Sequence, residues 1–354
     1  MTNLALESTG LVCAVGRSAP LACAAIRAGT SRRAPLPGQT VLSVDGEGEP
    51  AVGHAVAIVT GGYFLFARWR RLARAALLDL RSRLDANADA PAAWAKTLLV
   101  LVLPAPADRS LFDEPRTDAE WMATWAQPLV RSAGLALPER SVVLHIGADP
   151  AAALAALPRW LGERGCDRAV VVAADSCIEE GATRLFAEAG RLWSPERPVG
   201  LSPGEAGVAL LLSTTRNPAG LELAGTATAK VDVRDDTERG LAGNRLAECA
   251  RAALSSTPPA PTMQWIADLN GEVWRANQIG HAQVALAGAG IRLPGFETPA
   301  SRTGDTGVAQ LFLGIALAKH LHDRAGRGPF LITASGHGGQ LAACVLRRAD
   351  AARR

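Results

Sequence analysis

The sequence predicts an α/β protein built from two similar halves, and three observations predict it. Apolar runs of strand length, such as 97–103 and 168–174, alternate with Ala- and Leu-rich segments of helix length. The same alternation begins again after about residue 220, and hydrophobic residues make up 48% of the 354 residues. Strands that alternate with helices favour parallel pairing through crossover connections. We therefore expect a mostly parallel, mixed sheet in each half, with the halves spanning 1–220 and 221–354.

Composition narrows the classes of function and the expected location. The net charge is only +3, which gives no indication of a nucleic-acid or anionic-membrane partner. The six cysteines show neither CxxC spacing nor a His/Cys ligand pattern, so we expect free thiols and no metal site. No signal peptide and no apolar run of membrane-spanning length is evident. These features predict a cytoplasmic protein without nucleic-acid, membrane or cofactor partners.

The segment 141–175 organises the first half as strand, helix and strand. Residues 141–146 form a short Val-rich run, Gly147 turns the chain, Asp149 can cap a helix, and Pro150 suits its first turn. A helix start of this kind favours a bound anion or a thiolate, because its N–H groups are free and its dipole end is positive. The residues at this start, 147–150, include no nucleophile, and Asp149 would oppose a thiolate.

The remaining elements follow from periodicity and turn residues. We expect strands at 4–15, 207–213, 221–231, 264–269, 330–334 and 341–346, and helices at 19–28, 64–84, 120–134, 177–192, 241–254, 273–287 and 307–322. The segment 30–62 reads mostly as loop, with one short strand at 55–59. The NPAG turn at 217–220 predicts a hairpin or a tight connection. Arginines on helix 64–84 are expected to form a solvated basic side rather than a nucleic-acid face.

Four stretches together resemble the β-ketoacyl synthases, the condensing-enzyme branch of the thiolase superfamily. They are the opening strand and helix at 10–29, residues 167–175 followed by GRLWSPERPVGLSPGEAGVALLLS at 190–213, GDTGVAQLFLGIALA at 304–318, and SGHGGQLAACVL at 335–346. The resemblance implies a five-layered αβαβα fold with two similar halves. It also implies a dimer whose central strands pair across a two-fold axis, with 141–174 at the interface.

The catalytic residues that the family uses are all replaced. The place of the nucleophilic cysteine falls at or beside Ala148, that of the first histidine at Asn270 in LNGEVW, and that of the second at Asp305 in the GDTG turn. Asn270 could still bind a carbonyl, whereas Asp305 would repel an enolate. The resemblance therefore implies a catalytically inactive protein whose pocket would be lined by His145, Gly147, His337, Gly338 and Gly339.

Cys177 is the thiol nearest in sequence to the vacant nucleophile position. One interpretation makes it a displaced nucleophile. The other makes it an inert thiol beyond the strand, on the wrong side of the helix from the family's pocket.

Three functional hypotheses follow from the resemblance. The first is an inactive accessory subunit, because Asp175-Ser176, GRL at 190–192 and PGEA at 203–206 are similar to thiolase-like proteins associated with type VI secretion, which are thought to help load or stabilise an effector. The second is a working acyltransferase or 3-oxoacyl-ACP synthase with an unrecognised nucleophile. The third is a chain-length-factor-like subunit of a synthase pair. The expected partner is a thiolase-like subunit, in a homo- or heterodimer, and a secreted effector under the first hypothesis.

Overall fold

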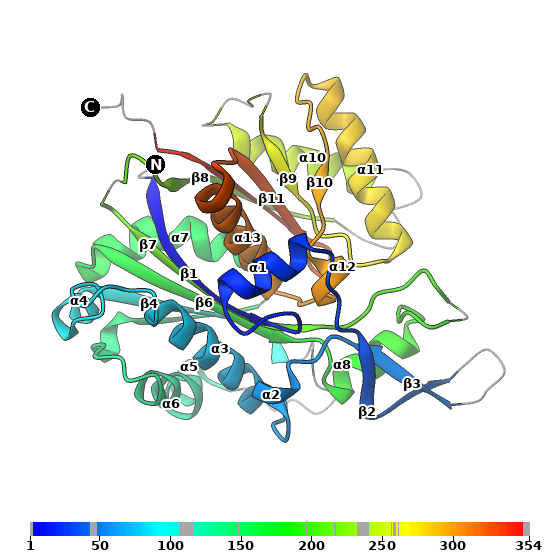
Figure 1. Cartoon of the computed structure of the whole chain (residues 1–354), viewed down its shortest axis with the longest axis horizontal. Helices are drawn as coiled ribbons and strands as arrows, with labels where there is room; N and C mark the ends of the chain where they lie inside the picture. The colour runs from blue at the N-terminus through cyan, green and yellow to red at the C-terminus, as the bar shows by residue number, and fades with distance from the viewer. Residues whose placement is uncertain are drawn as a thin grey trace.

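The computed structural model describes residues 3–42, 48–106, 109, 116–147, 149–195, 197–215, 217–231, 241–255, 257, 260 and 262–349. In this part of the chain a ten-stranded mixed sheet forms the framework (Figure 1). Its first-half strands are β1 (Leu4–Cys13), β4 (Thr97–Leu103), β5 (Val142–Ile146), β6 (Arg168–Ser176) and β7 (Glu205–Ser213). Its second-half strands are β8 (Leu221–Lys230), β9 (Gln264–Ile266), β10 (Phe296–Glu297), β11 (Phe330–Ser335) and β12 (Gln340–Arg348).

The two halves of the sheet repeat one topology. The strand order across the sheet is β10-β9-β11-β12-β8-β1-β7-β6-β4-β5. If the five strands of each half are numbered 1 to 5 in chain order, both halves have the order 3-2-4-5-1 from the outer edge of the sheet to its centre. In the first half β4, β5 and β6 are parallel, and β7 runs against both β6 and β1. In the second half β9, β10 and β11 are parallel, and β12 runs against β11 and β8. This arrangement confirms the predicted fold class of two similar, mostly parallel halves.

Helices complete a layered arrangement around these strands. The helices at the centre are α1 (Ala19–Arg27), α7 (Pro150–Arg164) and α13 (Ala309–Ala325). The central helices α7 and α13 contact strands of both halves, and one core cluster joins them all. The outer face of the first half is covered by α3 (Leu65–Arg81), α5 (Asp118–Trp121), the π-helical turn η2 (Met122–Ala126) and α6 (Gln127–Ser132). The outer face of the second half is covered by α10 (Leu241–Leu254) and α11 (Val273–Gly288).

Shorter elements connect these layers. They are β2 (Ala34–Leu42), β3 (Gly48–Gly53), α2 (Ala57–Thr60), α4 (Pro91–Ala95), the 3-10 turn η3 (Glu139–Ser141), α8 (Glu180–Glu188) and α12 (Ala300–Thr303). None of the described helices is both long enough and apolar enough to cross a lipid bilayer.

The central β5–α7–β6 unit forms for the reasons that its sequence indicates. Asp149 is the N-cap of α7, and its Oδ1 accepts a hydrogen bond from the Ala152 N–H at 3.1 Å. Pro150 occupies the first helical position, where its missing N–H costs no hydrogen bond. Gly165 ends the helix in the left-handed conformation that favours glycine. Every residue of β6 is buried, as expected for a strand covered on both faces.

Three sequence predictions differ from the structure. The segment 30–62 contains the antiparallel pair β2–β3, and residues 57–60 form α2 where a strand was expected. The helix expected at 177–192 begins only at Glu180, so Cys177 lies outside it. Strands β7 and β8 do not pair with one another, because β1 lies between them. The NPAG turn is therefore a tight connection between strands that are not neighbours in the sheet.

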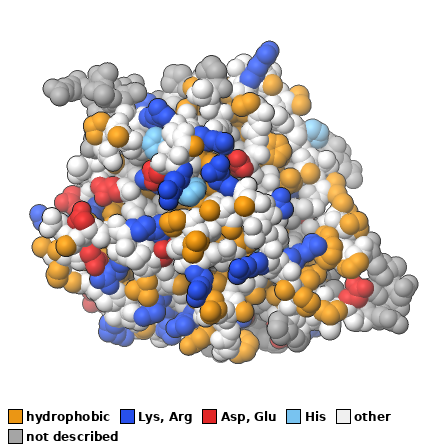
Figure 2. Space-filling view, in the orientation of Figure 1, with side chains coloured by type: hydrophobic (Ala, Val, Ile, Leu, Met, Phe, Trp, Pro, Cys, Tyr) orange, Lys and Arg blue, Asp and Glu red, His pale blue; other side chains and the backbone are white. Residues whose placement is uncertain are grey.

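The basic side of α3 is largely occupied by structural hydrogen bonds. Arg70 donates to the carbonyl oxygen of Thr124 at 3.1 Å, and Arg74 to that of Ser132 at 3.0 Å. These bonds fasten α3 to the α5–η2–α6 segment. Figure 2 shows Lys and Arg side chains spread among apolar and uncharged atoms on the face that it displays.

Candidate functional site

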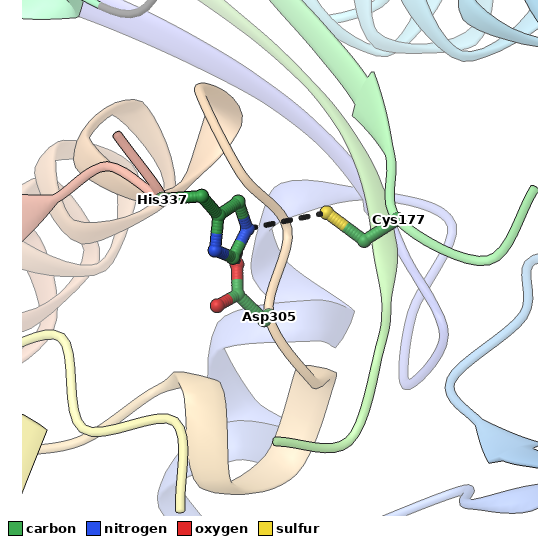
Figure 3. Close-up of side chains that lie close together, drawn as sticks. All are labelled: Cys177, Asp305 and His337. Carbon is green, nitrogen blue, oxygen red and sulfur yellow. Dashed lines mark hydrogen bonds and ion pairs between the residues drawn. The ribbon is translucent and has the colours of Figure 1, made fainter. Parts of the chain in front are cut away.

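Three chemically reactive side chains meet where the two halves of the sheet join the central helices. Cys177 directly follows β6, His337 lies in the loop between β11 and β12, and Asp305 lies between α12 and α13. Figure 3 shows the imidazole of His337 between the sulfur of Cys177 and the carboxylate of Asp305. His337 Nε2 is 3.9 Å from Cys177 Sγ and 3.6 Å from Asp305 Oδ1. We call these residues the Cys177–Asp305–His337 cluster.

The cluster includes two residues that the sequence had singled out and one that it had placed elsewhere. Asp305 and His337 were predicted site positions, whereas one interpretation put Cys177 on the wrong side of a helix from the pocket. This placement of Cys177 away from the pocket is wrong. β6 ends beside the loop that follows β11, so Cys177 lies next to His337.

Asn270, in the segment between β9 and α11, supports Asp305. Its Nδ2 donates to Asp305 Oδ2 at 2.7 Å and to Glu272 Oε2 at 2.9 Å, so two sequence-predicted positions are in direct contact. Burial would raise the pKa of Asp305, but His337, Arg275 and Asn270 together outweigh it and hold the pKa well below its ordinary value. Asp305 is therefore ionised at neutral pH.

Arg191 determines which nitrogen of His337 carries the proton. Its Nη2 lies 3.0 Å from His337 Nδ1, while Nε and Nη2 bind the Glu272 carboxylate at 2.7 and 2.8 Å. Because an arginine side chain offers only donors, Nδ1 must be the acceptor and therefore carries no proton. In the neutral imidazole the proton then lies on Nε2, the nitrogen that faces Cys177 and Asp305.

This protonation state leaves Cys177 without a general base. In a nucleophile–histidine–carboxylate triad the two partners contact opposite ring nitrogens, and the nitrogen beside the nucleophile is unprotonated. Here both partners face Nε2, which carries the proton. Burial also raises the pKa of the Cys177 thiol well above its ordinary value, despite the nearby Arg109. The geometry therefore disfavours Cys177 as a displaced nucleophile.

A second buried ion pair lies behind the cluster. Arg109 Nε and Nη2 bind Asp175 Oδ1 and Oδ2 at 2.8 and 2.7 Å, and both side chains are buried. Asp175 also accepts the N–H groups of Ser176 at 2.7 Å and Val308 at 2.8 Å. Gly307 has a φ of +55°, and a Cβ there would collide with both Asp175 and Arg109. This pair ties the end of β6 to the start of α13.

The surrounding buried layer contains more carboxylates than guanidinium groups among the described residues. Three arginines each have a carboxylate partner, in the pairs Arg109–Asp175, Arg191–Glu272 and Arg275–Asp268. Asp305 is the additional carboxylate, and Arg275 Nη2 approaches its Oδ2 only to 3.9 Å. Burial raises the pKa of Asp268 to about 6, even though Arg275 opposes this shift. The nearby Asp305 carboxylate adds to this upward shift in the pKa of Asp268.

The other predicted site residues lie around the cluster in structural roles. Ala148 falls outside the described residues. Gly147 donates its N–H to the Leu103 carbonyl at 3.0 Å, and His145 Nε2 contacts the Asp149 carbonyl at 2.8 Å. Gly338 and Gly339 belong to the tight loop between β11 and β12, in which Gly336 N donates to the Gln340 carbonyl at 2.7 Å.

The cavity beside the cluster is small. It measures about 30 Å³ and is lined by residues that include Arg109, Pro150, Val308, Gly336 and His337. His337 is the predicted pocket residue among those that line it. A volume of this size holds roughly one or two water molecules, because a single water needs about 10–15 Å³. It is too small for an acyl chain.

Sequence analysis missed the charged residues that control the cluster. Arg109, Arg191, Glu272, Asp268 and Arg275 were not singled out, although Asp175 is the last residue but one of the buried strand β6 and Asp268 lies two residues after β9. A charged residue at the end of a buried strand needs a partner, which is the signal that could have identified them. Their partners come from distant segments and could not be read from local sequence.

The comparisons with known proteins agree on the fold. No protein-family model and no curated protein matches the chain. Among solved structures, the chain is similar to the ishigamide ketosynthase/chain length factor, with 19% identity, a TM-score of 0.64, and coverage of 98% of this chain and 99% of that one.

Two further solved structures show the same similarity. The type II PKS acyl-carrier protein–ketosynthase complex AntDE:AntF matches with 15% identity, a TM-score of 0.71, and coverage of 99% and 100%. The ketosynthase ApeO in complex with its chain length factor ApeC, from Xenorhabdus doucetiae, matches with 12% identity, a TM-score of 0.65, and coverage of 98% of both chains. The chain therefore has the thiolase-like fold of the ketosynthases over nearly its whole length.

Proposed function

We propose that this chain is a non-condensing thiolase-fold subunit that acts in a pair with a second thiolase-fold subunit, as a chain length factor does with its ketosynthase. The observation that carries the proposal is the environment of the Cys177 thiol in the Cys177–Asp305–His337 cluster. The thiol that the described residues place beside the predicted site is buried, has a raised pKa and faces a protonated nitrogen. Such a thiol cannot form an acyl-enzyme at a useful rate.

The start of α7 supports the same conclusion. This is where the resemblance places a nucleophilic cysteine, and the positive end of the helix would favour a thiolate there. Asp149 instead caps the helix with its own carboxylate and takes up the Ala152 N–H. The helix start is thus already neutralised by a residue of the chain.

Pairing through β5 is supported by its place in the sheet. β5 is an edge strand, with β4 on one side and no strand on the other in the described part of the chain. Its residues Val142, Leu144 and Ile146 are only partly buried, although they pack against the first-half core. An apolar, uncharged edge strand is prone to pair with another strand, which favours a subunit partner at this edge.

The other two hypotheses have less support. A working condensing enzyme would need a reactive thiol, and Cys177 lacks the base that it would require. A role in loading a type VI secretion effector remains a prediction, because neither a described contact nor a compared structure bears on an effector.

Affinity purification of the tagged chain from its native host, followed by light scattering and mass spectrometry, tests the pairing. We expect a stable complex with a thiolase-fold chain, either one that carries the nucleophilic cysteine or a second copy of this chain. Leu144→Lys should dissociate the complex, and Val284→Lys, at a position that is 72% exposed on α11, should leave it intact.

Two outcomes would contradict the proposal. One is a single chain in solution for the unmodified protein. The other is a complex with a secreted effector and no thiolase-fold partner, which would favour the type VI secretion role.

A further inference from the structure

The arrangement around His337 differs from a catalytic triad in one specific way. The sulfur of Cys177 and the Oδ1 atom of Asp305 both face the same ring nitrogen, Nε2 (Figure 3). One ligand atom from each of the three residues lies within 4.8 Å of the other two. The atoms therefore converge on one point in space, which is the geometry of ligands around a metal ion.

The separations are close to those of a tetrahedral zinc site. Metal–ligand distances of about 2.0–2.3 Å at a tetrahedral centre place ligand atoms roughly 3.3–3.6 Å apart. The observed separations from Nε2 are 3.9 Å to Cys177 Sγ and 3.6 Å to Asp305 Oδ1. All three atoms lie within 4.8 Å of one another, so a contraction of the cluster would bring them into coordination. The adjacent cavity of about 30 Å³, which His337 also lines, has room for a water molecule as a fourth ligand.

The charge of the layer favours a cation at this point. Among the described residues, Arg109, Arg191 and Arg275 each pair closely with another carboxylate, and Asp305 lies 3.9 Å from the Arg275 guanidinium. A buried carboxylate is stabilised when a cation balances its charge.

Two hydrogen bonds already fix the orientation of the Asp305 carboxylate. Asn270 Nδ2 holds Asp305 Oδ2 at 2.7 Å, and the Gly307 N–H donates to Asp305 Oδ1 at 3.0 Å. Hydrogen bonds of this kind fix the orientation of a ligating carboxylate.

The opposing feature is Arg191. A histidine that binds a metal through Nε2 carries its proton on Nδ1 and donates it to an acceptor. Arg191 Nη2 now faces Nδ1, and Glu272 Oε2 lies 2.8 Å beyond it. The Arg191 side chain is 22% exposed and borders a surface groove of about 450 Å³. Withdrawal of Arg191 into this groove would leave Glu272 as the acceptor for the Nδ1 proton.

We propose that Cys177, Asp305 and His337 bind one divalent cation of the zinc class, and that Arg191 opposes this binding by stabilising the competing tautomer of His337. On binding, the thiol proton of Cys177 passes to solvent and the imidazole proton moves from Nε2 to Nδ1. The three side chains supply three ligands to the cation, and a water molecule supplies the fourth.

Titration of the chelator-treated, full-length protein with Co²⁺ tests this site. We expect one cobalt per chain and a thiolate-to-cobalt charge-transfer absorption, which only a sulfur ligand produces. Cys177→Ser should abolish the absorption, while Cys166→Ser, a half-buried thiol distant from the cluster, should leave it unchanged. Arg191→Gln should raise the cobalt affinity roughly ten-fold, the scale of second-shell effects.

Misfolding cannot explain a gain in cobalt affinity, because a misfolded Arg191→Gln variant would not bind cobalt more tightly. A folded protein without the absorption, or binding that is equal in the protein and in Cys177→Ser, would overturn the site. An affinity unchanged by Arg191→Gln would overturn the assigned role of Arg191.

Discussion

Two neighbouring parts of the buried polar layer each contain a buried aspartate, but they surround it differently. In the Arg109–Asp175 pair, the carboxylate receives two bonds from one guanidinium group and two from backbone N–H groups. In the Cys177–Asp305–His337 cluster, the carboxylate lies 3.6 Å from the imidazole of His337, and the thiol of Cys177 lies 3.9 Å from the same ring nitrogen. The Asp175 carboxylate is fully hydrogen-bonded, and its bonds hold structural elements together. The Cys177–Asp305–His337 cluster can still accept a metal ion as a further partner.

The comparison shows how the chemistry of the cluster can vary while the fold is kept. The saturated pair joins β6 to the start of α13 and does not depend on a nucleophile. The cluster can therefore change its chemistry without loosening the join between the two halves. The predictions below test this separation of roles, from the largest expected effect to the smallest.

Removal of Asp175 should cause the largest loss of stability. Asp175→Ala removes the carboxylate that binds two atoms of the buried Arg109 guanidinium, and breaking a buried ion pair typically costs about 3–5 kcal/mol. Urea denaturation should show this decrease in the free energy of unfolding. A loss below about 1 kcal/mol would show that the pair does not hold the two halves together.

Acid should destabilise the folded protein through protonation of His54, which packs against Gly304. Burial, together with the nearby Arg33, lowers the pKa of His54 to about 4, below its ordinary value of 6.5. Since the folded-state pKa is depressed, the unfolded state takes up the proton first, and stability falls as the pH drops from about 6.5 to 4. The loss should be on the order of 3 kcal/mol. His54→Phe should flatten this pH dependence relative to the unmodified protein, and equal slopes in both would contradict the assignment.

Removal of Asp305 should cost less than removal of Asp175. Asp305→Ala leaves the Gly307 N–H without its acceptor, but it also removes the carboxylate in excess, and Asn270 keeps its bond to Glu272. We expect a decrease of about 1–2 kcal/mol in the free energy of unfolding. Equal losses for Asp305→Ala and Asp175→Ala, measured side by side, would remove the distinction between the two arrangements.

The cap of α7 should give the smallest effect. Asp149→Ala removes the acceptor for the Ala152 N–H, which typically costs about 1 kcal/mol. Thermal denaturation should show a correspondingly small decrease in Tm. Asp149→Ser, which keeps a capping oxygen, should restore most of the loss, and a failure to do so would indicate a role other than capping.

Local sequence predicted the elements well and the cluster poorly, for a physical reason. The β5–α7–β6 unit and the Asp149 cap depend on residues close in sequence, so periodicity and one capping residue are enough to predict them. Cys177 and His337 are 160 residues apart, and their contact depends on the packing of the two halves. Nothing near Cys177 in the chain indicates that His337 will face it.

The β2–β3 pair shows a different limit. Its segment is rich in Pro and Gly, which indicate loops, and its pairing has a register irregularity between Pro35 and Thr40. Strand signals were thus masked by residues that usually interrupt strands. Asn270 and Asp305 were identified through resemblance to a family, which marked the positions but could not predict that they contact each other.

The central claim is that this ketosynthase fold has no thiol capable of forming an acyl-enzyme. Intact-mass spectrometry of the purified chain, after incubation with an acyl thioester of acyl carrier protein or coenzyme A, tests it most directly. The account predicts an unchanged mass with no covalent acyl adduct. A stoichiometric acyl adduct, at Cys177 or at any other residue near the cavity, would contradict it.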